Sequence, residues 1–285
     1  MNLSTTSLGL APEAAIDLQL HTTYSDGDWT DEQLLDYLIA EEFNLAAITD
    51  HDRVDTAHRL QKLAAEKQFP LLVAVEMSAQ WKVKLTDFLC FGFDPEDNYL
   101  NALAQDVTHR QHENTRQVFN YLLSKGYRVD PKDLAQMLVK PAAQQLPQLL
   151  ALAAKVIHDK NAIGRTLLDG GFAYMTHDPA TIVEAAHQSS AVCILAHPGR
   201  SDGFMCYDRA LLDELRTEAD IDGIEAYYPA HTSEQTTMYR DYAQDHKLLI
   251  SAGSDSHSPD KPPIKYKAEV CRSLLERIGI QIECS

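Results

Sequence analysis

The chain lacks paired cysteines, long apolar runs and an excess of positive charge. Its five cysteines are scattered without a C-x-x-C pair, so neither a disulfide framework nor a thiolate zinc site is indicated. No apolar run approaches the roughly 18 residues that a membrane span needs. The N-terminal residues show neither the basic start nor the apolar core of a signal peptide. We therefore expect a cytoplasmic protein without a membrane partner.

The shortage of basic residues limits the possible partners. Lys and Arg number 25 against 42 Asp and Glu, which gives a formal net charge of −17. This charge repels nucleic-acid phosphates at long range, so a long duplex is not an expected partner. A metal cluster and a few arginines can reverse the field inside one pocket. A small anionic substrate therefore fits the sequence, whereas the oligomeric state is left open.

Short apolar runs alternate with helical patterns along most of the chain. A length of 285 residues with 45% hydrophobic content can bury the core of one α/β barrel that carries an insertion. The runs that read as strands are 16–21, 45–49, 71–75, 85–93, 192–197, 223–227 and 248–251. Helical patterns at 30–42 and 56–67 separate the first three runs, and this alternation predicts parallel pairing.

One long stretch, residues 98–175, breaks this rhythm. It is rich in Gln, Leu and Ala, reads as helical, and contains prolines expected to stop helices at Pro131, Pro141 and Pro147. We interpret it as an inserted helical subdomain or lid. The barrel domain would then comprise residues 1–97 and 176–285.

Four segments share one design, an apolar run that ends in His or Asp. They are LQLHTTYSDG (18–27), ITDHD (48–52), LAHPGR (195–200) and SAGSDSH (251–257). Such runs read as buried strands whose polar ends gather at one edge of the fold. Neutral imidazoles and carboxylates are suitable ligands for a divalent cation. The pattern therefore indicates a metal-dependent hydrolase.

Individual residues in and beside these segments are candidate ligands. Gln19 and His21 share one face of the first strand, and Asp26 follows in the turn. His51 is the natural ligand of the second segment, because an Asx turn could account for its neighbouring aspartates. Glu76, at the end of the third apolar run, is placed to bridge two cations.

These segments resemble the motifs of the PHP family, the polymerase and histidinol phosphatase superfamily. The family motifs H-x-H-x-x-x-S-D-G, T-D-H-D, H-P-G-R and G-S-D-x-H are matched in order at His21 with 25–27, at 49–52, at 197–200 and at 253–257. The third-strand glutamate of the family corresponds to Glu76. The resemblance implies a distorted (β/α)7 TIM-like barrel around two or three divalent metal ions (Mn, Zn, Fe or Mg).

The resemblance also implies which residues hold each metal. His21, Glu76 and Asp255 would surround one ion, Asp26, His51 and His257 a second, and His197 with Glu76 a third. Arg200 would face the cluster and hold a phosphate oxygen, since its fork of donors suits that task. The alternative for Arg200 is a surface arginine in a glycine turn.

Two positions depart from the family pattern. Gln19 replaces the first histidine, and its neutral amide oxygen is a weaker ligand than imidazole. Asp87 stands where related proteins carry a histidine; it would favour Mn²⁺ or Mg²⁺ over zinc, or it would point to solvent from an edge strand. The departures favour an alternative function, a catalytically weakened PHP domain that serves as a binding or accessory module.

For an active centre, the implied chemistry is attack of metal-bound hydroxide on phosphorus while Arg200 holds a nonbridging oxygen. Asp52 and His231 are the candidate acids for the leaving group, although a helix-cap neighbourhood explains His231 equally well. The insertion resembles that of phosphoesterases for nucleoside 3′,5′-bisphosphates or short oligoribonucleotides, in which Arg165 would contact a second phosphate. Another small phosphorylated metabolite is also compatible. An amidohydrolase would want an intact H-x-H motif and a bridging lysine, and neither is visible.

Overall fold

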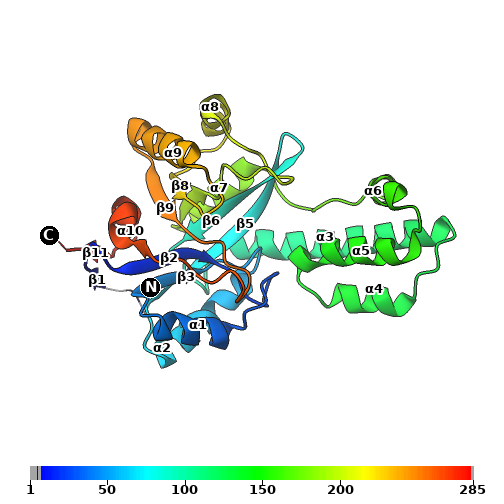
Figure 1. Ribbon diagram of the computed structural model, residues 1–285, viewed down its shortest axis with the longest axis horizontal. Coiled ribbons are helices and arrows are strands. Elements are labelled where there is room, and N and C mark those ends of the chain that lie inside the picture. The colour runs from blue at the N-terminus through cyan, green and yellow to red at the C-terminus, as the bar shows by residue number, and fades with distance from the viewer. Residues whose placement is uncertain (1–4, 6–7, 284–285) are drawn as a thin grey trace. The chain divides into compact units, whose positions relative to one another are not determined.

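The computed structural model describes residue 5 and residues 8–283, so Cys284 lies outside the described residues. The fold is mixed α/β, and its contacts divide the chain into two compact units (Figure 1). The first unit comprises Met1–Asn101 with His177–Ser285, and the second is Ala102–Thr176. None of the described helices combines the length and apolarity needed to cross a membrane.

Two sheets form the centre of the first unit. The four-stranded sheet has the order β10-β2-β3-β4, and the five-stranded sheet has the order β5-β6-β7-β8-β9. Their strands are β2 (Ala15–Leu20), β3 (Leu45–Ile48), β4 (Leu71–Leu72), β5 (Ala74–Trp81), β6 (Lys84–Phe91), β7 (Val192–Leu195), β8 (Gly223–Tyr227), β9 (Leu249–Ala252) and β10 (Tyr266–Lys267). A short parallel pair, β1 (Gly9–Leu10) with β11 (Gln281–Ile282), is not hydrogen-bonded to either sheet but packs in the same buried cluster through Leu10 and Ile282.

The expectation of parallel pairing holds for only part of these sheets. Strands β2, β3 and β4 pair in parallel, as do β7, β8 and β9. However, β6 runs antiparallel to both of its neighbours. The reason is the tight turn between β5 and β6, because a connection of two residues can join only antiparallel strands.

Helices of the first unit bury apolar faces against the sheets. They are α1 (Asp31–Ala40), α2 (Ala57–Glu66), α7 (Pro179–Gln188), α8 (Arg209–Glu218), α9 (Ser233–His246) and α10 (Arg272–Arg277). Thr30 and Gln33 form a capping box that starts α1, within the stretch predicted to be helical. Leu34, Leu38 and Leu60 then pack with β3 residues in one buried cluster. This packing fixes the ends of β2 and β3.

The two sheets adjoin at two single bridges. Leu20 at the end of β2 pairs with Ser256, and His51 after β3 pairs with Glu76 on β5. Backbone bonds reinforce the second bridge, since the Glu76 N–H donates to Thr49 O and the Asp52 N–H donates to Glu76 O. The carboxyl ends of strands from both sheets therefore meet in one place.

The second unit is helical and has its own core. It is built from most of α3 (Leu100–Ser124) together with α4 (Pro131–Leu138), α5 (Ala142–Val156) and α6 (Lys160–Asp169), drawn in green in Figure 1. Phe119, Leu122 and Leu149 are buried at its centre. Pro131 and Pro141 stand at helix starts, but the expectation for Pro147 was wrong. It lies inside α5, in the second turn, where few preceding carbonyls are affected.

The turn between β5 and β6 holds a strained residue. Lys82 and Val83 both adopt positive φ, at 47° and 64°, and the Val83 side chain is 91% exposed. A β-branched residue is disfavoured in this conformation, and no buried packing offsets the strain. We expect Val83→Gly to raise the free energy of unfolding by about 1 kcal/mol, measured by urea denaturation. The control is Val139→Gly, at an exposed valine with ordinary φ, which should not stabilise the protein. An equal increase in the free energy of unfolding in both variants would contradict backbone strain at Val83.

Candidate metal centre

The predicted ligand residues gather where the strands of the two sheets end. The ligand residues form three groups, and inside each group the ligand atoms all lie within 4.8 Å of one another. The groups are His21, Asp26, His51 and His257; His21, Glu76 and Asp255; and His51, Glu76 and Asp87. His197 joins the third group, since its Nε2 lies 3.7 Å from Asp87 Oδ2. The three groups share His21, His51 and Glu76, so the ligands form one continuous cluster.

Two of these residues occupy positions that differ from the sequence expectation. Glu76 lies inside β5, because this strand continues through Ala79 to Trp81 rather than ending before the glutamate. Asp87 lies on β6 between two neighbouring strands and is 1% exposed, so the solvent-facing alternative was wrong. Burial, followed by the negative charge of Glu76, raises the pKa of Asp87 to about 6.

Glu76 is the central residue of the cluster. Its Oε2 lies 3.0 Å from His21 Nε2 and 3.8 Å from His51 Nε2, and its Oε1 lies 2.9 Å from His197 Nε2. The side chain is fully buried, which by itself would raise its pKa. The nearby imidazoles outweigh burial and hold the pKa of Glu76 well below its usual range. Glu76 is therefore a carboxylate with an oxygen facing each side of the cluster.

The ring of His21 is stacked against His51 and against His257, with centroid distances of 4.7 and 4.1 Å, and those two rings lie 6.3 Å apart. Its Nε2 lies 3.2 Å from Asp255 Oδ1 and its Nδ1 lies 3.8 Å from Asp26 Oδ1. Yet both ring nitrogens and both of these oxygens are buried without a partner in hydrogen-bond geometry among the described residues. Buried polar atoms rarely lack a hydrogen-bond partner in native proteins. Atoms that converge without bonding one another fit the coordination of divalent cations.

The loop between His21 and Gly27 is held by Asp50. Its carboxylate accepts hydrogen bonds of 2.7 Å from Thr22 N, Thr22 Oγ1 and Ser25 Oγ. A Cβ at Gly27 would lie 2.6 Å from the His21 carbonyl oxygen, so only glycine permits this close approach. The serine and glycine of the first motif thus position His21 and Asp26.

Gln19 presents the N–H groups of its side-chain amide to the cluster. Its Nε2 donates to Glu76 Oε1 at 3.1 Å and to Oε2 at 3.0 Å. Its carbonyl oxygen, the atom expected to bind metal, is buried without a hydrogen-bond partner in the part of the chain that the structure describes. In this arrangement Gln19 holds the carboxylate of Glu76.

A cavity of about 720 Å³ opens beside the cluster. Its lining comes mainly from the loops after β7, β8 and β9 and includes Asp26, Asp255, His257, Arg200, Tyr228 and Lys261. Arg200 stacks over the Phe204 ring at 4.0 Å, is paired with Asp202, and has Nη1 3.9 Å from Asp255 Oδ2. Lys261 was missed from sequence, although it follows the last motif by four residues. The cavity places two cationic side chains near the ligand cluster.

Both candidate acids are hydrogen-bonded to backbone groups. His231 Nε2 accepts from the Gly199 N–H at 3.1 Å, and its Nδ1 donates to the Ala226 carbonyl at 3.2 Å. Burial lowers the pKa of His231 to about 4, so the ring is neutral with both nitrogens used. Asp52 is 2% exposed and accepts from the Ser78 N–H. These contacts favour positioning roles.

Arg165 lies on α6 of the helical unit, and its phosphate contact stays a prediction. Two buried carboxyl groups in the first unit were missed from sequence. Glu225 on β8 accepts the His197 N–H at 2.8 Å, and burial raises its pKa well above the usual range. Asp17 on β2 accepts from the Ser254 and Ile264 N–H groups, and burial raises its pKa to about 7. An acidic residue inside an apolar strand run was the only available signal.

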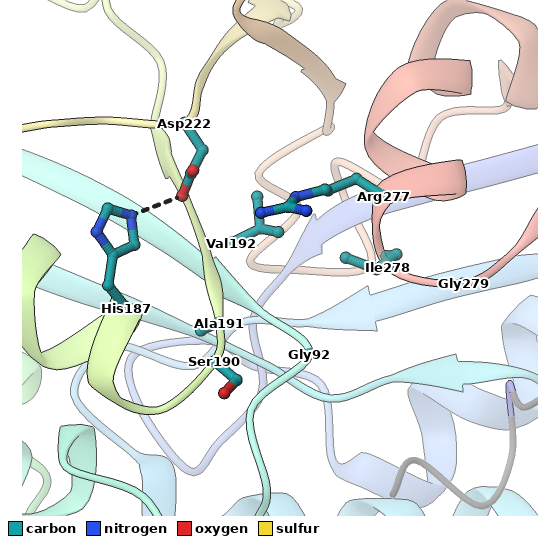
Figure 2. Close-up of a pocket in the computed structure, with 9 residues that line it drawn as sticks. All are labelled: Gly92, His187, Ser190, Ala191, Val192, Asp222, Arg277, Ile278 and Gly279. Atoms are coloured by element: carbon teal, nitrogen blue, oxygen red, sulfur yellow. Dashed lines mark hydrogen bonds and ion pairs between the residues drawn. The ribbon is translucent and has the colours of Figure 1, made fainter.

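A second cavity, of about 680 Å³, lies at the opposite ends of β7 and β8 (Figure 2). Val192 begins β7 and Asp222 precedes β8, whereas the candidate ligand His197 follows the other end of β7. Asp222 is its one lining carboxylate and already accepts from Cys193 N at 2.8 Å and contacts His187 at 3.0 Å. This cavity offers no comparable ligand group.

Relatives of known activity match nearly the whole chain. It is 27% identical over 287 residues to a 3′,5′-nucleoside bisphosphate phosphatase from Chromobacterium violaceum, covering 94% of this chain and 98% of the relative. It is 26% identical to a 5′-3′ exoribonuclease from Haemophilus influenzae, covering 85% and 90%. No protein-family model matches the chain.

A solved structure supports the architecture. An amidohydrolase from Chromobacterium violaceum, with bound sulfate and no metal, superposes with a TM-score of 0.74 at 23% identity, covering 93% of this chain and 96% of that one. At this identity the likeness shows a shared fold. The ordered motifs, the fold and the relatives agree with the resemblance of this chain to the PHP superfamily.

Proposed function

We propose that the chain is a metal-dependent phosphoesterase that hydrolyses nucleotide-like phosphate esters, such as a nucleoside bisphosphate or a short oligoribonucleotide. The observation that carries this proposal is the convergence of histidine and carboxylate ligand atoms beside a cavity that also presents Arg200 and Lys261. The named activities of the two relatives support the same substrate class.

The donor set suggests the metals. Four carboxylates and four histidines make up the cluster: Asp26, Glu76, Asp87, Asp255, His21, His51, His197 and His257. Two or three divalent ions fit these groups, and the carboxylate of Asp87 would favour Mn²⁺ or Mg²⁺ there. Bound metal would supply an activated water and neutralise phosphate charge.

The chain's own residues would bind and orient the ester. Arg200 would donate to a phosphate oxygen from the cavity side, and its stacking on Phe204 limits its freedom. His231 would hold the turn of Gly199, on which Arg200 depends, and Asp52 would hold the junction of β3 with β5. Tyr228, which lines the cavity, offers a face for stacking a base.

We also propose that the two sheets make one distorted barrel of the PHP type. The bridges of Leu20 with Ser256 and of His51 with Glu76 would be its two seams. The helical unit would be the insertion that selects the substrate, with Arg165 contacting a second phosphate. Mixed strand directions and single-bridge seams would account for the distortion.

A phosphate-release screen tests the function. Purified protein is incubated with added Mn²⁺ and with nucleoside 3′,5′-bisphosphates, dinucleotides and sugar phosphates. Released phosphate reports on the monoesters, and chromatography of the nucleoside and nucleotide products reports on the dinucleotides. We expect turnover of a nucleotide-like ester that depends on the added metal. Metal binding without turnover of any ester would instead support the accessory-module alternative, for which Gln19 and Asp87 are the motivating residues.

Arg200→Lys should weaken substrate use without changing metal content. Loss of the bidentate, charged hydrogen bonds is expected to lower kcat/KM by about 10- to 100-fold. The control is Arg209→Lys, at an arginine 49% exposed and paired with Asp245. Equal kcat/KM for both variants would contradict the phosphate role of Arg200.

A further inference from the structure

Strand β2 changes its partner along one edge at Asp17. Just before this residue, Ile16 pairs with Tyr266 of the antiparallel strand β10. Beyond it, the segment that follows β9 takes over in parallel, since Leu20 bridges to Ser256. Strand β3 pairs with the other edge of β2 on both sides of this point. The backbone N–H groups of both incoming segments therefore need acceptors at the crossover.

The Asp17 carboxyl group accepts one N–H from each of these segments. Its Oδ1 accepts the Ser254 N–H and its Oδ2 accepts the Ile264 N–H, both at 2.9 Å. Oδ1 also accepts the Gln19 N–H at 3.3 Å. Asp17 is 0% exposed, so these contacts lie away from bulk water. Each donor is a backbone N–H, and together the three contacts use both oxygens of one buried side chain.

The register of β2 is irregular at the same place. From Asp17 to Leu20 the chain advances three residues, whereas the paired stretch of β3 advances two. Irregularities of this kind bend a strand and change where its side chains point, and they are frequent beside active sites. Here the irregularity lies directly before His21, and Asp17 supplies the acceptor for the Gln19 N–H within it.

The contact with Ser254 places Asp17 one residue from a candidate metal ligand. Asp255 follows Ser254, and its N–H donates to the Gln19 carbonyl oxygen at 3.0 Å. Asp255 also adopts a φ of 55°, which is uncommon for a residue other than glycine, so its conformation depends on the contacts around it. The Ser254 contact with Asp17 is the first of the hydrogen bonds that hold this segment along β2.

We propose that Asp17 positions Asp255 for metal binding by holding the segment after β9 against β2. The proposal rests on the metal centre proposed above, in which Asp255 is a ligand. Asp255 Oδ1 lies 3.2 Å from His21 Nε2, so a small shift of its backbone would move one ligand out of their shared group. Asp17 belongs to none of the ligand groups among the described residues. Such outer contacts commonly change metal affinity by about 10- to 100-fold when they are removed.

Mn²⁺ titration of the metal-free protein tests this role, with free Mn²⁺ followed by electron paramagnetic resonance. Asp17→Asn replaces one acceptor oxygen by an NH₂ group, which cannot accept an N–H. We expect one Mn²⁺ site to be weakened by about 10- to 100-fold. The control is Asp222→Asn, because Asp222 also accepts a backbone N–H, that of Cys193 at 2.8 Å, but precedes β8. Both variants should lower the free energy of unfolding, and only Asp17→Asn should weaken Mn²⁺ binding.

A double variant separates positioning from general damage. Because Asp17 acts through Asp255, Asp17→Asn should cause little further loss of Mn²⁺ affinity in an Asp255→Asn background. Three results would overturn the proposal: unchanged affinity in Asp17→Asn, an equal loss in Asp222→Asn, or losses that simply add in the double variant. Tight Mn²⁺ binding by the wild type without phosphate release would overturn the proposed function alone, because the titration contains no substrate.

Asp17→Glu serves if Asp17→Asn fails to fold. This variant keeps both acceptor oxygens but moves them by one methylene group, so the segment after β9 is displaced rather than released. We expect weaker Mn²⁺ binding at the same site, and the Asp255→Asn background should again remove most of the difference. Wild-type Mn²⁺ affinity in folded Asp17→Glu would overturn the positioning role.

Discussion

Replacing Glu76 by Gln is expected to lower phosphate release by about 10³-fold or more. Glu76 presents one oxygen toward His21 and His51 and the other toward His197. The amide keeps the volume of the side chain but loses the charge and one ligand oxygen. Elemental analysis of the same sample should show fewer bound ions.

Glu66→Gln is the matched control, because Glu66 lies exposed on α2 away from the ligand groups. It should retain wild-type turnover and metal content. A circular dichroism spectrum shared by both variants and the wild type would show that the fold is kept. Retained turnover in Glu76→Gln would contradict the central role of this carboxylate.

Metal binding near pH 7 is expected to release protons. Although burial lowers the pKa values of His21, His51 and His197, the surrounding carboxylates outweigh it and raise all three. The pKa of His197 rises to about 9. The imidazoles are thus largely protonated without metal, yet a metal requires their neutral form. Apparent metal affinity should rise with pH up to about 9, where His197 titrates.

Isothermal titration calorimetry with Mn²⁺ in two buffers of different ionisation enthalpy measures this release. The apparent binding enthalpy should differ between buffers in proportion to the protons displaced. The stability of the metal-free protein depends on pH in the opposite direction to the metal affinity. Protonated His197 stabilises the metal-free fold fully below its unfolded pKa of 6.5, and that contribution is lost as pH rises through about 9. Equal enthalpies in both buffers would contradict the protonated cluster.

Sequence patterns predicted the elements whose signal is local. The motif residues His21, His51, His197 and His257 could be found because each follows a short apolar run. The helical pattern at 30–42 likewise predicted α1 close to its observed bounds. These features depend on neighbours in the chain, so spacing and residue type carry the information.

Features set by distant contacts were not predicted in the same way. The antiparallel placement of β6 follows from a turn at Lys82 and Val83, neither of which is a typical turn residue. Burial of Asp87 depends on its neighbours β5 and β7, and β7 lies about a hundred residues away. Glu225 is visible in sequence only as an acid within an apolar run, and its partner is the backbone of His197.

Phosphate release before and after chelation tests the central claim most directly, with the metal content measured in each sample. We predict two or three divalent ions per chain, loss of turnover of a nucleoside bisphosphate when they are removed, and recovery with Mn²⁺. Unchanged turnover in a sample shown to contain no metal would contradict the proposed function, as would a fully loaded protein that hydrolyses no phosphate ester.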